Sequence, residues 1–259
     1  MTSDLAALGP AARFEIHADR IVARTPDLPD YWTGNVVIFR IAAVDPVPQI
    51  ACFHRDFPDA AHVALVWDDP HATLGPEHAA LGEAGFDVNL DDVLTRHRAP
   101  SVPPPPDGIR LRACRDDADW EVATALQIET GLEEGYDPNA HPVFVAEHMA
   151  LRRRHARAGG LRWFGAFDGG TLVADLGVVA TDRIVRFQDV ETRASHRRRG
   201  IAAALLAHAS TWAARTAPHA VQVIVAEAGG SAGRFYRRLG FVPTERIASA
   251  VRGRYGRDG

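Results

Sequence analysis

Four successive prolines, at positions 103–106, interrupt this chain of 259 residues. Proline fixes φ and removes the backbone N–H, so neither a helix nor a central strand can pass through such a run. The run favours polyproline II geometry at about 3.1 Å per residue, which makes residues 99–107 a semi-rigid spacer of roughly 28 Å. We therefore predict two domains, residues 1–98 and residues 108–259. The alternative is a long surface loop within one domain.

The segment after the prolines alternates regularly between strand and helix patterns. Apolar residues recur at helical spacing from Ile201, and Val221 begins a continuous apolar run typical of a buried central strand. The turn at residues 168–170, Asp-Gly-Gly, lies between two apolar runs and indicates a hairpin. The patterns predict an α+β fold with a mixed α/β sheet and helices on both faces. Strands are expected near 109–113, 162–167, 171–180, 184–192, 221–226 and 241–251, and helices near 116–129, 141–157, 201–213 and within 229–239.

The segment before the prolines is less regular. Strand-like runs cover 13–24, 35–43 and 62–67, and helix patterns cover 47–57 and 76–84. We expect a smaller α+β domain with few helices.

Composition removes several kinds of chemistry. All 29 basic residues are arginine, which excludes Schiff-base catalysis, a lysine general base and a nucleotide-binding P-loop. Cys52 and Cys114 belong to no CxxC pair, so a disulfide framework or zinc site is not expected. His141, His148 and His155 repeat every seven residues, about 10.5 Å apart along a helix. We interpret them as a polar stripe and expect no metal site.

Charge is divided unevenly along the chain. Residues 1–100 carry 7 arginines against 15 acidic residues, a net −8, whereas residues 101–259 carry 22 against 18, a net +4. A total of −4 argues against a nucleic-acid partner, while the basic part suits a phosphorylated small molecule. The chain has neither a run of 18 apolar residues nor a signal-peptide pattern at its start. We expect a cytoplasmic protein with no membrane partner.

The most informative stretch is His-Arg-Arg-Arg-Gly-Ile-Ala at residues 196–202, between a predicted strand and a predicted helix. The first N–H groups of a helix have no intrahelical acceptor, and they bind anions together with the helix dipole. Gly200 lets the backbone approach an anion closely. By itself, the stretch also fits a basic loop that caps a helix.

Two motifs together resemble the GNAT superfamily of acyl-CoA N-acyltransferases. Arg197-x-x-Gly200-x-Ala202 is similar to the family's Q/R-x-x-G-x-G/A motif and follows the predicted fourth strand of the second domain. Ala232-x-x-x-Tyr236-x-x-x-Gly-Phe resembles the family's second signature. The resemblance covers roughly residues 109–252 and implies the GNAT fold.

The resemblance also implies a set of site residues. Acetyl-CoA would be the co-substrate, with its pyrophosphate on the backbone amides of residues 198–203 and its pantetheine arm along the strand at Val190 and Thr192. The thioester carbonyl would accept a backbone N–H near Val190, as in an oxyanion hole. Tyr236 occupies the position of the family's general acid. Many members have Asn where this chain has Gly229, and Ser231 is expected to substitute. The implied cofactor-binding residues are Val190, Thr192, Arg197, Arg198, Arg199, Gly200, Ile201, Ala202, Ala203 and Ser231.

Amine acetylation needs a base, because an amine with a pKa of about 10.4 is neutral in only one molecule in roughly 10³ at pH 7. Candidate carboxylates are Glu191 and Asp189 on the predicted strand, Glu133 and Glu134 between the two predicted helices, and Glu227 after the next strand. We select Glu191 as the catalytic base, with Tyr236 donating a hydrogen bond to the departing thiolate.

Two further patterns bear on the function of the chain. Gly229-Gly-Ser231-Ala-Gly233 fits the nucleophile elbow of α/β-hydrolases, but no histidine follows His219 to complete a triad in their order. In the first domain, Leu81-Gly-Glu-Ala-Gly-Phe resembles the segment that ends at Leu239-Gly-Phe. We interpret this domain as a degenerate, non-catalytic GNAT-like copy without CoA, the alternative being an unrelated α+β cap.

The sequence therefore predicts an N-acetyltransferase that moves the acetyl group of acetyl-CoA to an amine by direct attack in a ternary complex. The rival hypothesis is a non-catalytic acyl-CoA-binding sensor or partner-binding module. The acceptor is expected to be a small-molecule or peptide amine. Small amines, antibiotics, amino acids and protein N-termini all stay open, as does a homodimer.

Overall fold

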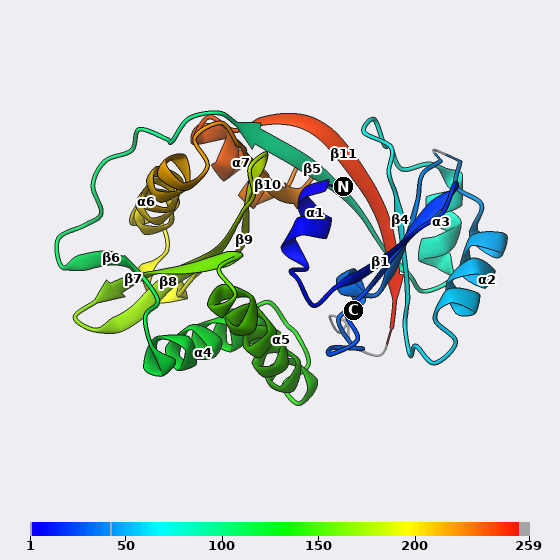
Figure 1. Cartoon of the computed structure of the whole chain (residues 1–259), viewed down its shortest axis with the longest axis horizontal. Helices are drawn as coiled ribbons and strands as arrows, with labels where there is room; N and C mark the ends of the chain where they lie inside the picture. Colours follow the sequence, from blue (N-terminus) through cyan, green and yellow to red (C-terminus); the bar gives the residue numbers. More distant parts are fainter. Residues whose placement is uncertain (1, 42, 254–259) are drawn as a thin grey trace. The chain divides into compact units, whose positions relative to one another are not determined.

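The computed structural model describes residues 2–41 and 43–253 (Figure 1). The chain divides into two compact units. Within the described residues, unit 1 comprises residues 2–41, 43–94, 225–237 and 242–253, and unit 2 comprises residues 95–224 and 238–241. The predicted limits at residues 98 and 108 stay a prediction. The units themselves are not continuous in sequence, because two late segments belong with the N-terminal part.

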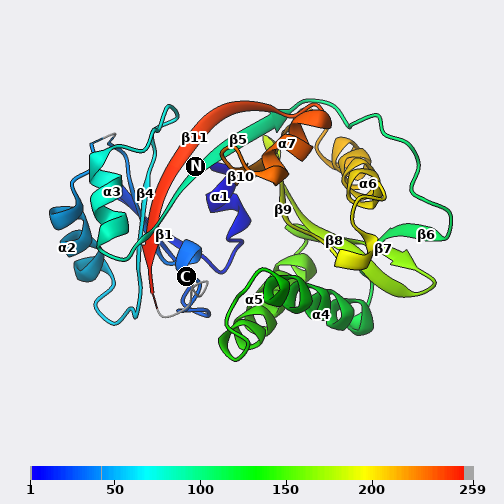
Figure 2. The ribbon, with the colours of Figure 1, turned by 180° about the vertical axis from the view of Figure 1, so that it is seen from behind.

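Unit 1 is built on strands in the order β1-β2-β3-β4-β11-β5. Strand β3 pairs in parallel with β4, and β11 pairs antiparallel to β4 with Ala248 opposite Trp67. Helices α2 and α3 lie on one side of these strands (Figures 1 and 2). The elements are α1 (Thr2–Ala7), β1 (Arg13–Ile16), β2 (Arg20–Arg24), a 3-10 turn (Trp32–Gly34), β3 (Val36–Phe39), α2 (Pro46–Asp56), β4 (Val63–Trp67), α3 (Pro76–Glu83), β5 (Asp87–Arg96), α7 (Ser231–Arg238) and β11 (Val242–Arg252).

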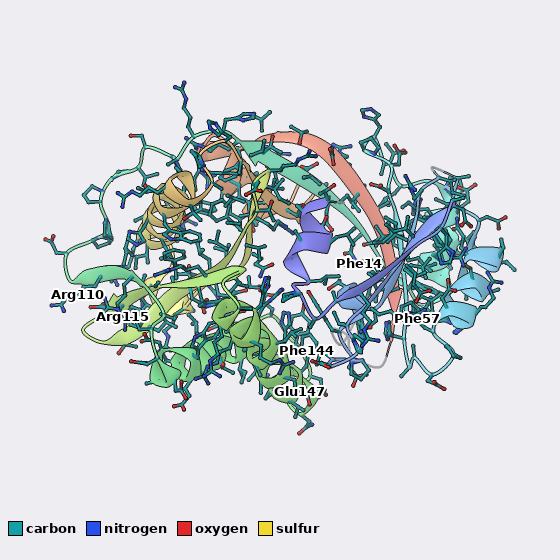
Figure 3. All side chains as sticks on the ribbon, viewed as in Figure 1. Phe14, Phe57, Arg110, Arg115, Phe144 and Glu147 are labelled. Carbon is teal, nitrogen blue, oxygen red and sulfur yellow. The ribbon has the colours of Figure 1, made fainter. Side chains whose placement is uncertain are left out.

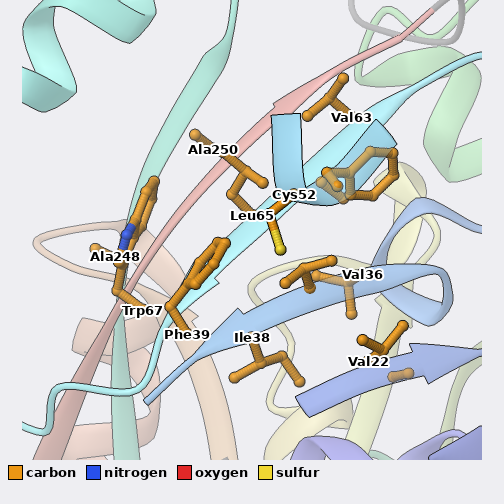
Figure 4. Packing of buried hydrophobic residues seen from close by; sticks show 14 of the residues in the cluster. Val22, Val36, Ile38, Phe39, Cys52, Val63, Leu65, Trp67, Ala248 and Ala250 are labelled. Atoms are coloured by element: carbon orange, nitrogen blue, oxygen red, sulfur yellow. The ribbon is translucent and has the colours of Figure 1, made fainter. Parts of the chain in front are cut away.

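The core of unit 1 draws on both ends of the sequence. The fully buried Phe53 of α2 belongs to the same buried cluster as Leu65 of β4 and Ala248 and Ala250 of β11. Figure 4 shows Leu65, Ala248 and Ala250 within this cluster. The sequence run 13–24 is a hairpin of two strands, because His17 donates its N–H to the Arg20 carbonyl at 2.8 Å and turns the chain. Helix α1 and the 3-10 turn were not predicted.

Unit 2 has the strand order β10-β9-β8-β7-β6. Strand β9 is parallel to β10 and antiparallel to β8, so this sheet is mixed, as predicted. Helices α4 and α5 lie on one face of β7, β8 and β9, and α6 lies on the other (Figures 1 and 2). The elements are β6 (Ile109–Ala113), α4 (Asp117–Glu133), α5 (Ala140–Arg157), β7 (Leu161–Asp168), β8 (Thr171–Ala180), β9 (Ile184–Thr192), a 3-10 turn (Ala194–His196), α6 (Ile201–Thr216) and β10 (Val221–Glu227).

The helices of unit 2 begin where sequence signals place them. Asp116 caps α4 by accepting the Asp119 N–H at 3.0 Å, and Asp119 in turn holds the Arg112 guanidinium. Strand β6 lies at the edge of the sheet, with Arg110 on it and Arg115 just after it (Figure 3). The predicted order of strands and helices across residues 109–252 is confirmed.

Candidate active site

The loop between β9 and α6 forms an anion-binding geometry. Arg198 and Gly200 both have left-handed backbones, with φ of 65° and 78°, and Gly200 is the residue before the first turn of α6. The first intrahelical bond runs from the Ala204 N–H to the Gly200 carbonyl at 3.0 Å. The N–H groups of residues 201–203 therefore precede the helical hydrogen-bond pattern, and their direction along the helix axis suits a phosphate.

The three arginines of this loop have different roles. Arg198 and Arg199 are exposed beside the helix start. Arg197 instead donates from Nε to the Thr192 carbonyl at 2.8 Å and from Nη2 to Glu133 at 2.7 Å. Arg197 thus ties the loop to the end of α4, a structural function that the motif alone did not indicate.

Strand β9 leaves one side unpaired by β10 toward its C-terminal end. The parallel pairing with β10 covers Ile184, Val185 and Arg186 only, although β9 continues to Thr192. On its other side, β9 pairs with β8, but the register shifts between Asp175 and Gly177. Two β9 residues, Asp189 and Val190, therefore stand opposite Leu176 in a β-bulge. Val190 and Thr192 lie on the part of β9 beyond the β10 pairing.

Asp189 gives this bulge its shape. Its φ of 50° is left-handed, a conformation that aspartate tolerates better than most residues. The carboxylate lies 3.4 Å from the Arg152 guanidinium of α5, which is almost fully buried. The ion pair holds Asp189 against α5 and distinguishes it from Glu191 among the predicted bases.

Glu191 is in the environment of a general base. Its backbone is directly opposite Asp175 of β8. Burial and the negative charge of Glu134 raise the pKa of Glu191 to about 7, and Thr130 of α4 lowers this pKa only in part. A carboxyl group with that pKa is about half ionised at pH 7, and its carboxylate form is basic enough to accept a proton from an ammonium or from water.

Opposite Glu191 on the neighbouring strand β8 lies a buried carboxyl group that the sequence did not indicate. Asp175 has no exposed surface, and it accepts hydrogen bonds from Trp163 Nε1 at 2.9 Å and from Gln127 Nε2 at 2.8 Å. Burial raises the pKa of Asp175, and these two hydrogen bonds oppose that change. Only a three-dimensional arrangement brings α4, β7 and β8 together at this point.

The second motif begins in unit 1, which contains its residues 232–237, and ends in unit 2, which contains residues 238–241. Ser231 begins α7 as an exposed residue after Gly229, whose φ is 77°, and Tyr236 of the same helix is 7% exposed. The next residue, Arg237, is ion-paired with Asp92 of β5, and Arg246 of β11 reaches the same carboxylate at 3.2 Å. Asp92 is 2% exposed in its side chain. No local sequence pattern predicts that this carboxylate anchors α7.

The histidines and cysteines have structural environments. His141 and His155 are buried where α5 packs in unit 2, so the predicted polar stripe is wrong for these two. Burial lowers the pKa of His148 to about 3 and of His155 to about 4, which keeps both neutral at pH 7. Burial and nearby carboxylates raise the pKa of the Cys114 thiol, which disfavours the nucleophilic thiolate. Within residues 2–41 and 43–253, no group of three His, Cys, Asp or Glu side chains has the arrangement of a metal site.

A family comparison agrees with this geometry. Residues 159–243, which include β7 to α7, match the family model of the acetyltransferase (GNAT) domain. The match contains the β9–α6 loop as well as Tyr236. This chain therefore contains a GNAT acetyltransferase domain, and the resemblance inferred from the two motifs is confirmed.

Solved structures with the same fold span nearly the whole chain. A GCN5-related N-acetyltransferase from Kribbella flavida has a TM-score of 0.64 at 20% identity, covering 96% of this chain and 93% of that one. A tandem GNAT protein from the clavulanic acid biosynthesis pathway has 0.53 at 15%, with coverages of 97% and 87%. A functionally unknown conserved protein from Staphylococcus epidermidis has 0.69 at 12%, with 92% of each chain covered. The predicted fold class is confirmed.

A search of curated proteins found no match. Among the helices of the described residues, none is both long and apolar enough to span a membrane.

Proposed function

We propose that this protein is an N-acetyltransferase that transfers the acetyl group of acetyl-CoA directly to an amine. The observation that carries the proposal is the arrangement in unit 2, where Glu191, with a pKa of about 7, lies on the same strand end that leads into the anion-binding start of α6. The proposed site for a nucleotide thioester and the proposed base thus belong to one continuous segment of the chain. The GNAT domain match over residues 159–243 supports acyl transfer as the reaction class.

The cofactor is expected to bind along β9 and α6. The amides of residues 201–203 and the exposed Arg198 and Arg199 suit the pyrophosphate. The pantetheine amides would pair with the part of β9 that β10 leaves open, at Val190 and Thr192. The thioester carbonyl would then accept the Val190 N–H, which stabilises the negative charge that develops on this oxygen during attack.

Glu191 accepts the proton of the acceptor, and Tyr236 donates a hydrogen bond to the leaving group. Glu191 takes a proton from the acceptor ammonium, directly or through water, and the neutral amine nitrogen attacks the thioester carbon. The new C–N bond forms, the C–S bond breaks, and the second proton passes from the nitrogen to the CoA thiolate, directly or through water, as the amide is completed. Tyr236 donates a hydrogen bond to the departing thiolate, because full transfer from a tyrosine of pKa about 10 to a thiolate of about 8.5 is uphill. The protonated Cys114 thiol favours direct attack over a covalent acyl-enzyme.

Turnover against a panel of amines tests this proposal. Release of free CoA from acetyl-CoA is followed with a thiol reagent, with small diamines, aminoglycosides, amino acids and a short peptide as separate acceptors. We expect acceptor-dependent release for at least one class, and loss of that release in Glu191→Gln. Acetyl-CoA binding by calorimetry without turnover on any amine would contradict the enzyme and favour an acyl-CoA sensor.

A further inference from the structure

A single side-chain amide links the buried carboxyl group of unit 2 to the β9 bulge. Gln127 of α4 donates from Nε2 to Asp175 Oδ1 at 2.8 Å and to the Asp189 carbonyl oxygen at 3.2 Å. An amide nitrogen carries two hydrogens, so one group serves both acceptors. The flipped amide would place its oxygen against both acceptors, which fixes the orientation of Gln127.

The bond to Asp189 has a consequence for the following residue. The carbonyl of Asp189 and the N–H of Val190 belong to the same peptide unit, which is planar and trans. Within such a unit, C=O and N–H point in opposite directions. When Gln127 holds the Asp189 oxygen toward α4, it also directs the Val190 N–H away from α4.

The bulge needs such an external restraint. Asp189 has a left-handed backbone within a strand, and the ladder with β8 is interrupted at this position. A peptide unit without regular ladder bonds rotates more readily than one inside a continuous sheet. Gln127 replaces the missing ladder bond with one from a helix.

Asp175 in turn fixes Gln127. The carboxyl group is fully buried, and Trp163 occupies its other oxygen, so Gln127 meets one preorganised acceptor. A buried polar group that loses its partner is destabilised, which makes this pairing persistent. Asp175 is also the cross-strand partner of Glu191, so the same network underlies both β9 groups of the proposed site.

We infer that Gln127, held by Asp175, is a positioning residue that aims the Val190 N–H at the thioester carbonyl. The inference rests on the proposed function, because it assigns the oxyanion contact to Val190. It adds two residues, one outside the matched GNAT segment, that touch neither acetyl-CoA nor the amine. Their effect is transmitted through one peptide plane.

The test compares two variants that each remove one donor to Asp175. Gln127→Met keeps the length of the side chain but frees the Asp189 carbonyl, whereas Trp163→Phe leaves that carbonyl bond in place. The main readout is the infrared carbonyl stretch of bound acetyl-CoA labelled with ¹³C at the thioester carbon, measured without acceptor. In the wild type, a hydrogen bond shifts this stretch below its solution value.

We expect Gln127→Met to lose about half or more of the shift, and kcat with an established acceptor to fall about 10- to 100-fold. The Kd for acetyl-CoA should stay within about threefold, because most binding contacts are unchanged. Trp163→Phe should lower the melting temperature yet retain the shift. Gln127→Glu serves if the methionine variant does not fold. Its shift should be small at pH 8 and recover partly at low pH, where a protonated carboxyl group can donate.

The outcomes distinguish the oxyanion role of Val190 from the positioning role of Gln127. Wild-type protein that binds acetyl-CoA with no carbonyl shift contradicts the oxyanion role of Val190, and with it this part of the proposed function. A wild-type shift that persists unchanged in Gln127→Met overturns the positioning role alone. Equal loss of the shift in Gln127→Met and Trp163→Phe also overturns it, since the network then serves only stability.

Discussion

The two units contain the same strand–helix–strand arrangement with different helix starts. In unit 1, β3 leads through α2 to the parallel strand β4, and in unit 2, β9 leads through α6 to the parallel strand β10. Helix α6 begins Ile-Ala-Ala after a left-handed glycine, so its first three residues all carry N–H groups. Helix α2 begins Pro-Val-Pro after Asp45, so two of its three donors are missing and a carboxylate precedes them.

The remaining contacts of α2 complete the contrast. Gln49 accepts the Asp45 N–H at 3.1 Å and the Trp67 indole N–H at 3.0 Å, so the α2 start is bonded within the protein. The helices that follow the two arrangements, α7 after β10 and α3 after β4, both belong to unit 1 and also differ. Tyr236 is four residues before Gly240-Phe241, and the buried Leu81 is four residues before Gly85-Phe86. One arrangement thus retains anion donors and a phenol where the other has prolines and an alkyl side chain.

The largest expected effect is on cofactor binding at the α6 start. Gly200→Glu places a carboxylate among the amides that suit the pyrophosphate, and calorimetry should show CoA affinity reduced at least about 100-fold. Gly200→Asn controls for the left-handed backbone, which asparagine tolerates, and should bind CoA. Val47→Glu adds a carboxylate at the exposed second residue of α2 and should leave CoA affinity unaltered, with one CoA per chain. If the wild type binds a second equivalent of CoA and Val47→Glu loses it, the α2 start also binds CoA and the contrast between the two helix starts is refuted.

The second effect concerns Glu191 of β9. The corresponding strand of unit 1, β3, has the sequence Val-Val-Ile-Phe and carries no titratable group. Glu191→Gln should lower kcat/KM about 10²- to 10⁴-fold at pH 8. The wild-type kcat/KM should rise with pH and level off above about 7, because only ionised Glu191 accepts a proton. If kcat/KM of Glu191→Gln still rises with pH in the same range, another residue is the base.

Stability should respond to Glu191 in the opposite direction. A carboxyl group whose pKa is raised on folding, from 4.5 to about 7, contributes stability below pH 4.5 that is lost as pH rises through 7. Glutamine does not titrate. The melting temperature of Glu191→Gln should therefore match the wild type near pH 4 and exceed it at pH 8.

The third prediction compares Tyr236 with Leu81. Tyr236→Phe removes a hydrogen bond to a developing charge, so kcat should fall about 10- to 150-fold while acetyl-CoA affinity and melting temperature stay nearly constant. Leu81→Ala should instead cost about 2–5 kcal/mol of stability, because it opens a cavity at a 1% exposed site. Its kcat, measured well below its melting temperature, should remain near wild type. If Tyr236→Phe keeps the wild-type kcat when chemistry limits the rate, Tyr236 of α7 has only a packing role, as Leu81 of α3 does.

The smallest effect comes from the charge difference between the two parts of the sequence. If the net −8 of residues 1–100 attracts a cationic acceptor, kcat/KM should fall a few-fold between about 0.01 and 0.3 M salt, because screening shortens the range of exposed charges. A neutral hydroxylamine-type acceptor is the control. A flat salt profile for a cationic acceptor would remove the recruiting role from the acidic part.

Sequence periodicity predicted most elements, because the helices of unit 2 each bury one stripe and its strands are bounded by glycine-rich or polar turns. Gly200 was informative because its left-handed φ is a local requirement of the loop. The bulge at Asp189 was not predicted, because strand alternation alone cannot show an extra residue. Asp92 and Asp175 were missed for a related reason, since their partners lie 145 and 48 residues away in sequence and no local pattern connects them.

The pairing of β11 with β4 bears on how this chain reaches its folded state. Trp67 of β4 lies opposite Ala248, so a central ladder of unit 1 closes a loop of about 180 residues. Contacts so distant in sequence carry a large closure entropy and slow folding. A fragment ending at the proline run would leave β4 with an open apolar edge, prone to intermolecular pairing. The fragments on either side of the prolines should therefore fold better when expressed together than when expressed alone.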